Sequence, residues 1–296
     1  MNKKLFAFIA VAAAILTGCA GDEVLTDISE PKEILFSVSE AGLETRAGTT
    51  TDNITDFGIS ISNPVASQYT YNNVKVEKAS TKWTTAQQLL WHNLNDTVDI
   101  VAMSPYSSQA VNLCGISNYA VSVKADQTKG LEASDLLAWK ATALVPERDL
   151  NSDGTLDIQF QHLMCQLNIV VVFDQNLDSE YLKSNPIQSL SVNGTKLNGT
   201  CNFTAATPTV KETGTSGTIY AQESQAFVAK TEGQTAKAYY SCLIVPQSIS
   251  SYAFSIKLNV NGANGGTQYY LWTLKPSTKF EAGRTYTVTL SNFSPK

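Results

Sequence analysis

The segment Leu163-Met-Cys-Gln-Leu-Asn-Ile-Val-Val-Val-Phe173 decides the fold class of this chain. Apolar residues recur in it at every second position, which is the period of a β-strand with one strongly buried face. We therefore expect an all-β protein built around this strand. The alternating positions are Leu163, Cys165, Leu167, Ile169, Val171 and Phe173.

Shorter strand-like segments lie on both sides of it. In the last of them, Tyr286, Val288 and Leu290 alternate with threonines. Many short strands at regular spacing predict β-sandwiches rather than helical bundles. The other expected strands fall at residues 34–38, 59–61, 98–103, 190–192, 239–245, 252–260 and 269–274.

Turn-forming residues separate these strands. Asn193-Gly194, Asn198-Gly199 and Asn261-Gly262 are typical of hairpin turns, because Asn and Gly tolerate a positive φ. Asp56-Phe57-Gly58 is expected to turn the chain into the strand that follows. The one stretch with a helical pattern, Thr85–Leu90, is long enough for little more than a single turn.

A polar stretch, Asp149–Gly154, divides the chain into two apolar halves. It predicts one β-sandwich domain at residues 47–154 and a second at residues 155–296. The same stretch places oxygen ligands at the spacing of a calcium-binding loop, but Phe160 stands where the loop needs a glutamate, and no helices flank it. A polar turn is therefore favoured over a weak Ca²⁺ site, and no other metal is expected. The oxygen-bearing residues of the calcium candidate are Asp149, Asn151, Asp153 and Asp157.

The chain begins with the features of an export signal. Lys3 and Lys4 precede an apolar run at residues 5–16, which is shorter than the roughly 20 residues of a membrane-spanning helix. Leu16-Thr-Gly-Cys19 resembles the lipobox of bacterial lipoproteins. The resemblance implies that residues 1–18 are removed and that Cys19 carries acyl chains such as palmitate, which would anchor the protein in a membrane. The alternative is an ordinary signal peptide with an incidental cysteine.

The residues after Cys19 bear on the compartment. No aspartate follows it directly, and Asp22-Glu23 resembles the acidic export signal of surface lipoproteins in Bacteroides-like bacteria. We therefore expect the outer membrane, on its exposed side. A solvated linker that happens to carry two charges is the alternative.

Composition excludes several functions. The net charge is −5 and there is no basic cluster, which argues against binding to nucleic acid. There is no HExxH, GxSxG or phosphate-binding glycine loop, so neither an enzyme nor a cofactor is expected. The cysteines after Cys19 could form one disulfide or none, and their spacing does not choose a pairing. They are Cys114, Cys165, Cys201 and Cys242.

Histidine and tryptophan offer the remaining candidate sites. His162 is expected to be a packed residue with a hydrogen-bonded ring rather than a catalyst. The four tryptophans could form a platform for sugars, although aromatic residues in sandwiches more often belong to the core. This platform is the basis of an alternative function, a surface lipoprotein that binds glycans without polymerising. The tryptophans are Trp83, Trp91, Trp139 and Trp272.

Several phrases together resemble the fimbrillins, the pilin lipoproteins of Bacteroidales. They occur in the order of that family and start with the lipobox. The resemblance implies two transthyretin-like β-sandwich domains and a structural role in a surface fimbrium that supports adhesion. The phrases are Leu90-Trp91 with Val98–Tyr106, Ser134–Leu137 with Phe160–Cys165, Leu243–Gln247 and Phe280–Val288.

The resemblance also implies a maturation step. Fimbrillins are cut after an arginine by a trypsin-like, Arg-specific protease, and Arg46 stands where that arginine is expected, followed by Ala47. Residues 19–46 would then form a propeptide that contains one strand. An exposed arginine in an ordinary linker is the alternative.

Strand exchange is the assembly mechanism that the resemblance implies. The face formed by Ile34, Phe36 and Val38 would fill a groove in the first domain until the cut at Arg46 releases it. A terminal strand of another fimbrillin subunit would then take its place, as in donor-strand complementation. The sequence ends at Lys296, soon after the strand at 286–290, which favours a tip or accessory subunit that accepts a strand.

Overall fold

A computed structural model describes residues 31–40 and 53–295 of the chain. By its contacts the chain divides into residues 1–30, which lie outside the described residues, and residues 31–296. The described part is all-β, as predicted, with one short α-helix. None of the helices in this part of the chain has the length and apolar character that a membrane crossing requires. The helical elements are α1 (Pro146–Asp149) and the 3₁₀ turns Ser67–Tyr69, Leu113–Gly115, Glu132–Ser134 and Tyr181–Lys183.

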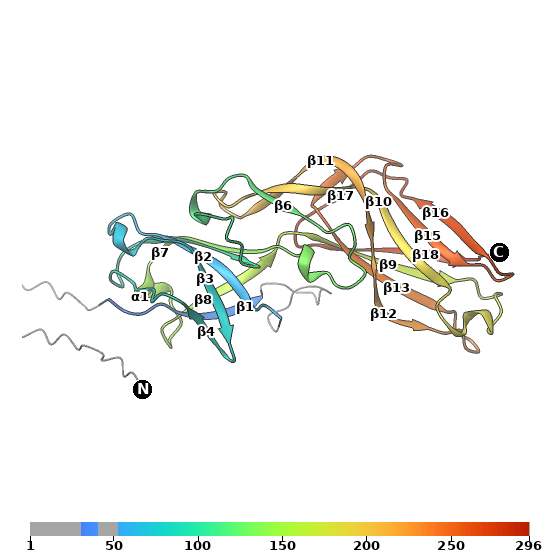
Figure 1. The fold of residues 1–296 in the computed structure, drawn as a ribbon, viewed down its shortest axis with the longest axis horizontal. Coiled ribbons are helices and arrows are strands. Elements are labelled where there is room, and N and C mark those ends of the chain that lie inside the picture. The colour runs from blue at the N-terminus through green and yellow to red at the C-terminus, as the bar shows by residue number, and fades with distance from the viewer. Residues whose placement is uncertain (1–30, 41–52, 296) are drawn as a thin grey trace, which may run out of the picture. The chain divides into compact units, whose positions relative to one another are not determined.

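The first sheet has seven strands, in the order β1-β8-β7-β5-β2-β3-β4. Its pairings are antiparallel except at one end, where β1 runs parallel to β8 (Figure 1). The strands are β1 (Leu35–Glu40), β2 (Asp56–Ser62), β3 (Tyr71–Ala79), β4 (Lys82–Thr85), β5 (Val98–Ser104), β7 (Leu137–Leu144) and β8 (Thr155–His162).

Three further sheets hold the rest of the chain. A five-stranded sheet has the order β11-β10-β15-β16, with β6 also paired to β10, and a four-stranded sheet has the order β12-β13-β9-β18. A short ribbon pairs β14 with β17. These strands are β6 (Tyr119–Ser122), β9 (Cys165–Phe173), β10 (Ile187–Asn202), β11 (Thr209–Tyr220), β12 (Gln222–Val228), β13 (Lys237–Ile244), β14 (Gln247–Ile249), β15 (Ser255–Asn261), β16 (Thr267–Thr273), β17 (Thr278–Phe280) and β18 (Thr285–Phe293).

Two hydrophobic cores lie against these sheets. The second core takes buried residues from β9 and β13 of one sheet and from β10 and β15 of another, which is how a β-sandwich is packed. The first core lies against the seven-stranded sheet. It comprises Ile34, Ile54, Phe57, Ile59, Ile61, Val76, Leu89, Trp91, Val98, Ile100, Ala102, Leu137, Leu144, Leu156, Ile158 and Phe160.

Strand β5 contributes to both cores. Ile100 and Ala102 belong to the first core, whereas Val101 and Met103, which point to the opposite side, belong to the second. A strand buried on both faces needs apolar residues at nearly every position. This explains why residues 98–103 form a compact apolar run rather than an alternating one.

The main strand prediction is confirmed, but two predicted hairpin turns are wrong. Asn193-Gly194 and Asn198-Gly199 both lie inside the long strand β10, at two irregularities in its pairing with β11. Gly194 uses its positive φ of 90° there, and a Cβ at this position would lie 1.9 Å from the carbonyl oxygen of Ala253. The glycine therefore serves a bulge and a close approach. The turn at Asn261-Gly262 does follow the end of β15.

Two further local predictions are wrong. Thr85–Leu90 is not helical: Thr85 ends β4, and Leu90 forms a bridge with Glu33. Asp56-Phe57-Gly58 is not a turn but the first part of β2, with Phe57 fully buried. In both cases tertiary pairing overrides a local signal, because six or fewer residues carry little preference of their own.

The boundary at residue 154 stays a prediction. Strand β8, which follows it, pairs with β1 and with the end of β7, so it is part of the seven-stranded sheet.

Candidate functional site: the slot that holds the first strand

Strand β1 presents an apolar face to the first core. Ile34 is only 4% exposed, and Phe36 and Val38 are half-buried against that core. The ring of Phe36 meets that of Phe57 edge-on at 5.9 Å, and Phe57 in turn contacts Phe160 at 5.6 Å. The three residues singled out from their alternation therefore lie together on one buried face.

Backbone hydrogen bonds hold the segment at both of its ends. Residues 35–40 pair in parallel register with residues 155–160 of β8. Just before them, the Ile34 N–H donates to the Leu89 carbonyl at 2.9 Å, and the Trp91 N–H donates to the Lys32 carbonyl at 2.8 Å. We call the surface that residues 32–40 cover, made of β8, residues 89–91 and the adjacent first core, the β1 slot.

The opposite face of β1 is polar. The hydroxyls of Ser37 and Ser39 both donate to Oδ1 of Asp157, at 3.2 and 3.4 Å. The Asn151 amide also donates to Ser37 Oγ at 3.2 Å. With one apolar and one polar face, a shift of a single residue would put every side chain of β1 on the wrong side. The slot therefore fixes the register of the strand that occupies it.

Tyr71 holds the wall of the slot formed by residues 89–91. Its hydroxyl accepts from the Leu90 N–H at 2.9 Å and donates to the Leu90 carbonyl at 3.1 Å. Both backbone groups of Leu90 are thus paired by one side chain. The flanking residues Leu89 and Trp91 are buried in the first core.

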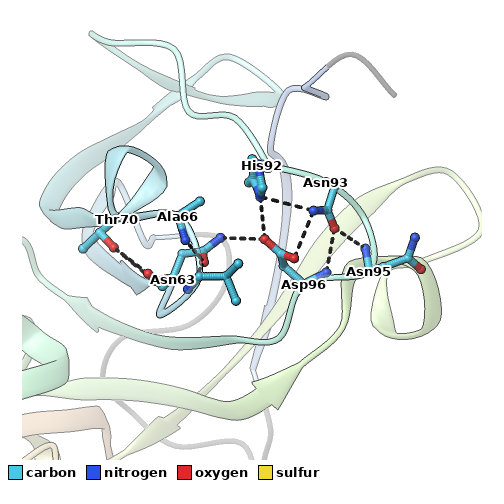
Figure 2. A network of polar contacts seen from close by, with 8 residues as sticks. Asn63, Ala66, Thr70, His92, Asn93, Asn95 and Asp96 are labelled. Atoms are coloured by element: carbon cyan, nitrogen blue, oxygen red, sulfur yellow. Dashed lines mark hydrogen bonds and ion pairs between the residues drawn. The ribbon is translucent and has the colours of Figure 1, made fainter. Parts of the chain in front are cut away.

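A polar network continues from this wall (Figure 2). The carboxylate of Asp96 contacts Nδ1 of His92 at 2.6 Å and accepts from the side-chain amides of Asn93 and Asn63 at 2.9 and 3.4 Å. Burial alone would raise the pKa of Asp96, but these hydrogen bonds outweigh it and lower the pKa. The network therefore ties residues 92–96 to the loop after β2 through a charged carboxylate.

Asn63 and Asn93 shape the two loops of this network. Oδ1 of Asn63 accepts from the backbone N–H groups of Val65 and Ala66, both at 2.9 Å. Oδ1 of Asn93 accepts in the same way from Asn95 and Asp96, at 2.8 and 2.7 Å (Figure 2). Each asparagine builds an Asx-type turn and uses its amide N–H₂ to reach Asp96.

The last strand lies at the edge of the four-stranded sheet. β18 pairs in parallel with β9, and its Leu290 is 7% exposed. Tyr286 and Val288 are half-buried against the second core. Phe293 contacts Phe173 at 5.5 Å and Tyr270 at 4.9 Å. This strand is integrated into its own sheet.

Several predicted site residues lie in parts of the chain that the structure does not describe. The lipidation site Cys19, the cleavage residues Arg46 and Ala47, and the whole signal peptide lie outside the described residues. Their roles stay predictions.

The four residues of the calcium candidate have other partners. Hydrogen bonds from Arg148, and from the Val145 N–H, hold the pKa of Asp149 at about 2. Asp153 accepts from the N–H and the hydroxyl of Thr155. Asn151 and Asp157 bond to β1, as described above. Within residues 31–40 and 53–295, no group of three or more His, Cys, Asp or Glu side chains is arranged to hold a metal ion.

The histidine prediction is confirmed. His162 is 6% exposed, and its Nδ1 lies 2.9 Å from Oδ2 of Asp135, which is also buried. The pair sits within the packed structure at the end of β8.

The cysteines after Cys19 are all free thiols. Burial raises the pKa of Cys114 to about 11 and that of Cys201 to about 12, and it raises the pKa of Cys242 further. A thiol reacts as the thiolate, so these groups are unreactive at neutral pH.

The tryptophans belong to the cores, as the commoner interpretation predicted. Trp91 is 3% exposed, and Trp83 and Trp139 pack against the first core. Trp272 packs against the second core. They do not form a shared platform: they are divided between the two cores.

The wall at residues 89–91 is the part of the site that sequence reasoning missed. Leu89 and Trp91 are buried on either side of the half-buried Leu90, which is a two-residue period. That alternation was available in the sequence, but the run is so short that the preceding residues suggested a helix instead.

The fold and the slot define an all-β protein in which a short edge strand is held by a distant part of the chain. The chain belongs to the fimbrillin-like family, whose sequence profile matches residues 45–292, and this is a family of structural proteins rather than enzymes. A search of curated protein sequences finds no match.

Solved structures from Bacteroides species share the fold. A proposed cell adhesion protein from Bacteroides uniformis is 23% identical, with a TM-score of 0.57 over 88% of this chain and 93% of that one. Another from Bacteroides ovatus is 18% identical, with a TM-score of 0.58 over 90% and 94%. A fimbrial protein from Bacteroides vulgatus is 14% identical, with a TM-score of 0.54 over 88% and 95%. At these identities the likeness shows the fold alone.

Proposed function

We propose that this protein is a subunit of a cell-surface fimbrium and that it assembles by accepting a strand from a neighbouring subunit. The observation that carries the proposal is the β1 slot. A single short strand, far in sequence from its partner β8, covers an apolar surface of the first core and pairs with exposed backbone at both ends.

Removal of β1 would leave a site suited to another strand. The backbone groups of β8, Leu89 and Trp91 that now pair with residues 32–40 would lose their partners, and Phe57 would be uncovered on one side. Unpaired strand edges next to apolar surface bind extended peptides readily, because backbone pairing and side-chain burial are both satisfied. A donor strand with apolar residues at alternate positions would restore both.

The propeptide model explains how β1 would leave. β1 ends at Glu40, six residues before Arg46, so a cut after Arg46 would separate the strand from the rest of the chain. The family profile also begins close to this bond, at residue 45. Both facts support cleavage between Arg46 and Ala47.

The geometry of β18 supports a subunit that accepts a strand, at the tip of the fimbrium or as an accessory. Leu290 is buried and Phe293 packs on two rings, so the strand fills its own sheet. Because β18 completes its own sheet, it is not available for donation to another subunit. Before cleavage the protein would be held at the outer membrane through acylated Cys19, and after cleavage it would join other fimbrillin subunits in the fimbrium.

The test is the first residue of the protein recovered from the surface of its cells. We expect Ala47 in wild type, and a chain that still begins with acylated Cys19 in the Arg46→Ala variant, which should also be absent from fimbriae. Arg148→Ala, a change at an exposed arginine, is the matched control and should be processed normally. Equal processing of Arg46→Ala and wild type would refute the cleavage step.

A further inference from the structure

A hollow lies on the outer face of the four-stranded sheet, away from the β1 slot. Its volume is about 260 Å³, and it is lined by residues of β9, β12, β13 and β18. The side chains that give it its chemistry are Gln166, Asn168, Ser224, Gln225, Tyr239 and Thr287.

The lining of the hollow is polar but carries no charge. Amides, hydroxyls and a tyrosine ring line it, together with Ile169, Val170 and Tyr240. A different hollow near β14 and β17 is lined by Lys211, Glu212, Lys279 and Glu281. The absence of charge in the first lining disfavours an ionic ligand, since a bound charge would find no opposite partner there.

One group in this hollow lacks a hydrogen-bond partner. Gln166 is 2% exposed; its Nε2 donates to Asn168 Oδ1 at 2.8 Å, but its Oε1 has no partner among the residues that the structure describes. Buried polar atoms are nearly always paired, and an unpaired one destabilises the fold. The oxygen itself is covered, and a turn of the Gln166 amide toward the hollow would let a donor on a ligand satisfy it.

Cross-strand register places the other groups around it. Thr287 of β18 is opposite Asn168, and Tyr239 of β13 is opposite Val170, so all of them project from the same face as Gln166. Tyr239 is half-buried and Thr287 is exposed, so the hollow is open to a ligand from solution. The set thus offers neutral donors and acceptors beside one aromatic ring.

We propose that this hollow binds one sugar ring of a neutral glycan. Neutral amides and hydroxyls match the hydroxyls of a sugar, and an aromatic ring covers the apolar C–H face of a pyranose. The volume lies just below the range of about 300–1,000 Å³ that is typical for whole drug-sized ligands, which suits a single terminal ring. The site does not depend on strand exchange, so it stands apart from the proposed assembly mechanism.

The experiment uses the full chain on an array of neutral glycans with terminal glucose, galactose, mannose or N-acetylglucosamine, together with sialylated and sulfated counterparts. We expect binding to at least one neutral glycan. Tyr239→Ala should raise the Kd for that glycan about tenfold or more, and Thr287→Val should raise it a few-fold, because each change removes a contact to the ligand. Tyr269→Ala is the matched control, because Tyr269 is an exposed tyrosine on the other sheet, and it should bind as wild type does.

Gln166→Leu tests the unpaired oxygen directly. It should abolish binding while thermal unfolding shows that the chain still folds. If this variant fails to fold, the two surface variants decide the matter. The proposal is overturned if wild type binds no neutral glycan, if it binds only charged ones, or if Tyr239→Ala and Thr287→Val bind as tightly as wild type.

Discussion

Strands β1 and β18 use the same arrangement at two places in the molecule. Each lies at the edge of a sheet and runs parallel to its single partner, β8 or β9. Parallel neighbours cannot be joined by a tight hairpin, and Ser37 of β1 contacts Asp157 of β8, 120 residues along the chain. Neither strand is therefore joined to its partner by a hairpin turn.

The two strands differ in their place relative to the family profile and the predicted cleavage site. β1 comes before both, whereas β18 lies almost wholly within the residues that the profile matches. β18 also ends in Phe293, which packs on two rings of the second core. Under the proposed mechanism β1 would be replaced and β18 would be retained, although their pairing geometry is the same.

The largest effect is expected from the apolar face of β1. Changing Ile34, Phe36 and Val38 together to Asp should lower the free energy of unfolding of the uncut chain by at least about 4 kcal/mol, because burial of such side chains is worth roughly 1.5–3 kcal/mol each. Urea denaturation of the uncut chain would measure this.

The control is Leu35→Asp, which lies on the other face of β1 and is 48% exposed. It should change stability by less than about 1 kcal/mol. A triple variant as stable as wild type would mean that β1 does not fill the slot.

A somewhat smaller effect is expected in β18. Leu290→Ala should cost about 2–5 kcal/mol, the range for truncating a buried leucine. Unlike the change in β1, it should destabilise the uncut chain and the chain trimmed to Ala47 alike, because both contain β18. Thr289→Ala, at an exposed neighbour, is the control. If trimming removed the effect of Leu290→Ala, the contrast between the two strands would be wrong.

A peptide that copies the first strand should be able to replace β1, which tests the proposed difference between β1 and β18. The chain trimmed to Ala47 should be stabilised by a peptide that copies residues 31–40, by about 2.7 kcal/mol when the peptide is present at 100 times its Kd. A peptide with its apolar residues moved by one position should have little effect, because its apolar face would point outward. Thermal melts with the two peptides test this, and equal melting temperatures would count against strand exchange.

The smallest effect concerns the polar network beyond the slot wall. The pKa of Asp96 is lower in the folded chain than its ordinary value of 3.8, so its charged form stabilises the fold. This contribution is complete above about pH 4 and is lost as the pH falls through the folded pKa. Asp96→Asn should therefore lower stability by about 1 kcal/mol at pH 7 and flatten the loss of stability below pH 4.

Melting temperatures between pH 2.5 and 7 would show the change, with the exposed Glu232→Gln as control. If the melting temperature of Asp96→Asn falls below pH 4 as steeply as that of wild type, this account of the network is wrong.

Local sequence predicted these regions with unequal success. The alternation of residues 34–38 and of residues 286–290 correctly indicated β1 and β18, because a strand with one buried face has an apolar residue at every second position. The same logic placed β9. It failed at Asn193-Gly194, where the same residues that close a hairpin instead allow a bulge in β10.

What the sequence by itself determined is which residues face the cores: the alternating apolar positions of β1, β9 and β18, and the continuous run of β5. What only the tertiary structure decided is which strands are neighbours. The parallel pairing of β1 with β8, the wall at residues 89–91 and the hollow around Gln166 each join segments that are distant in the chain. The physical reason is that the polarity of each side chain governs whether it is buried, whereas strand pairing depends on backbone groups that are alike at every position.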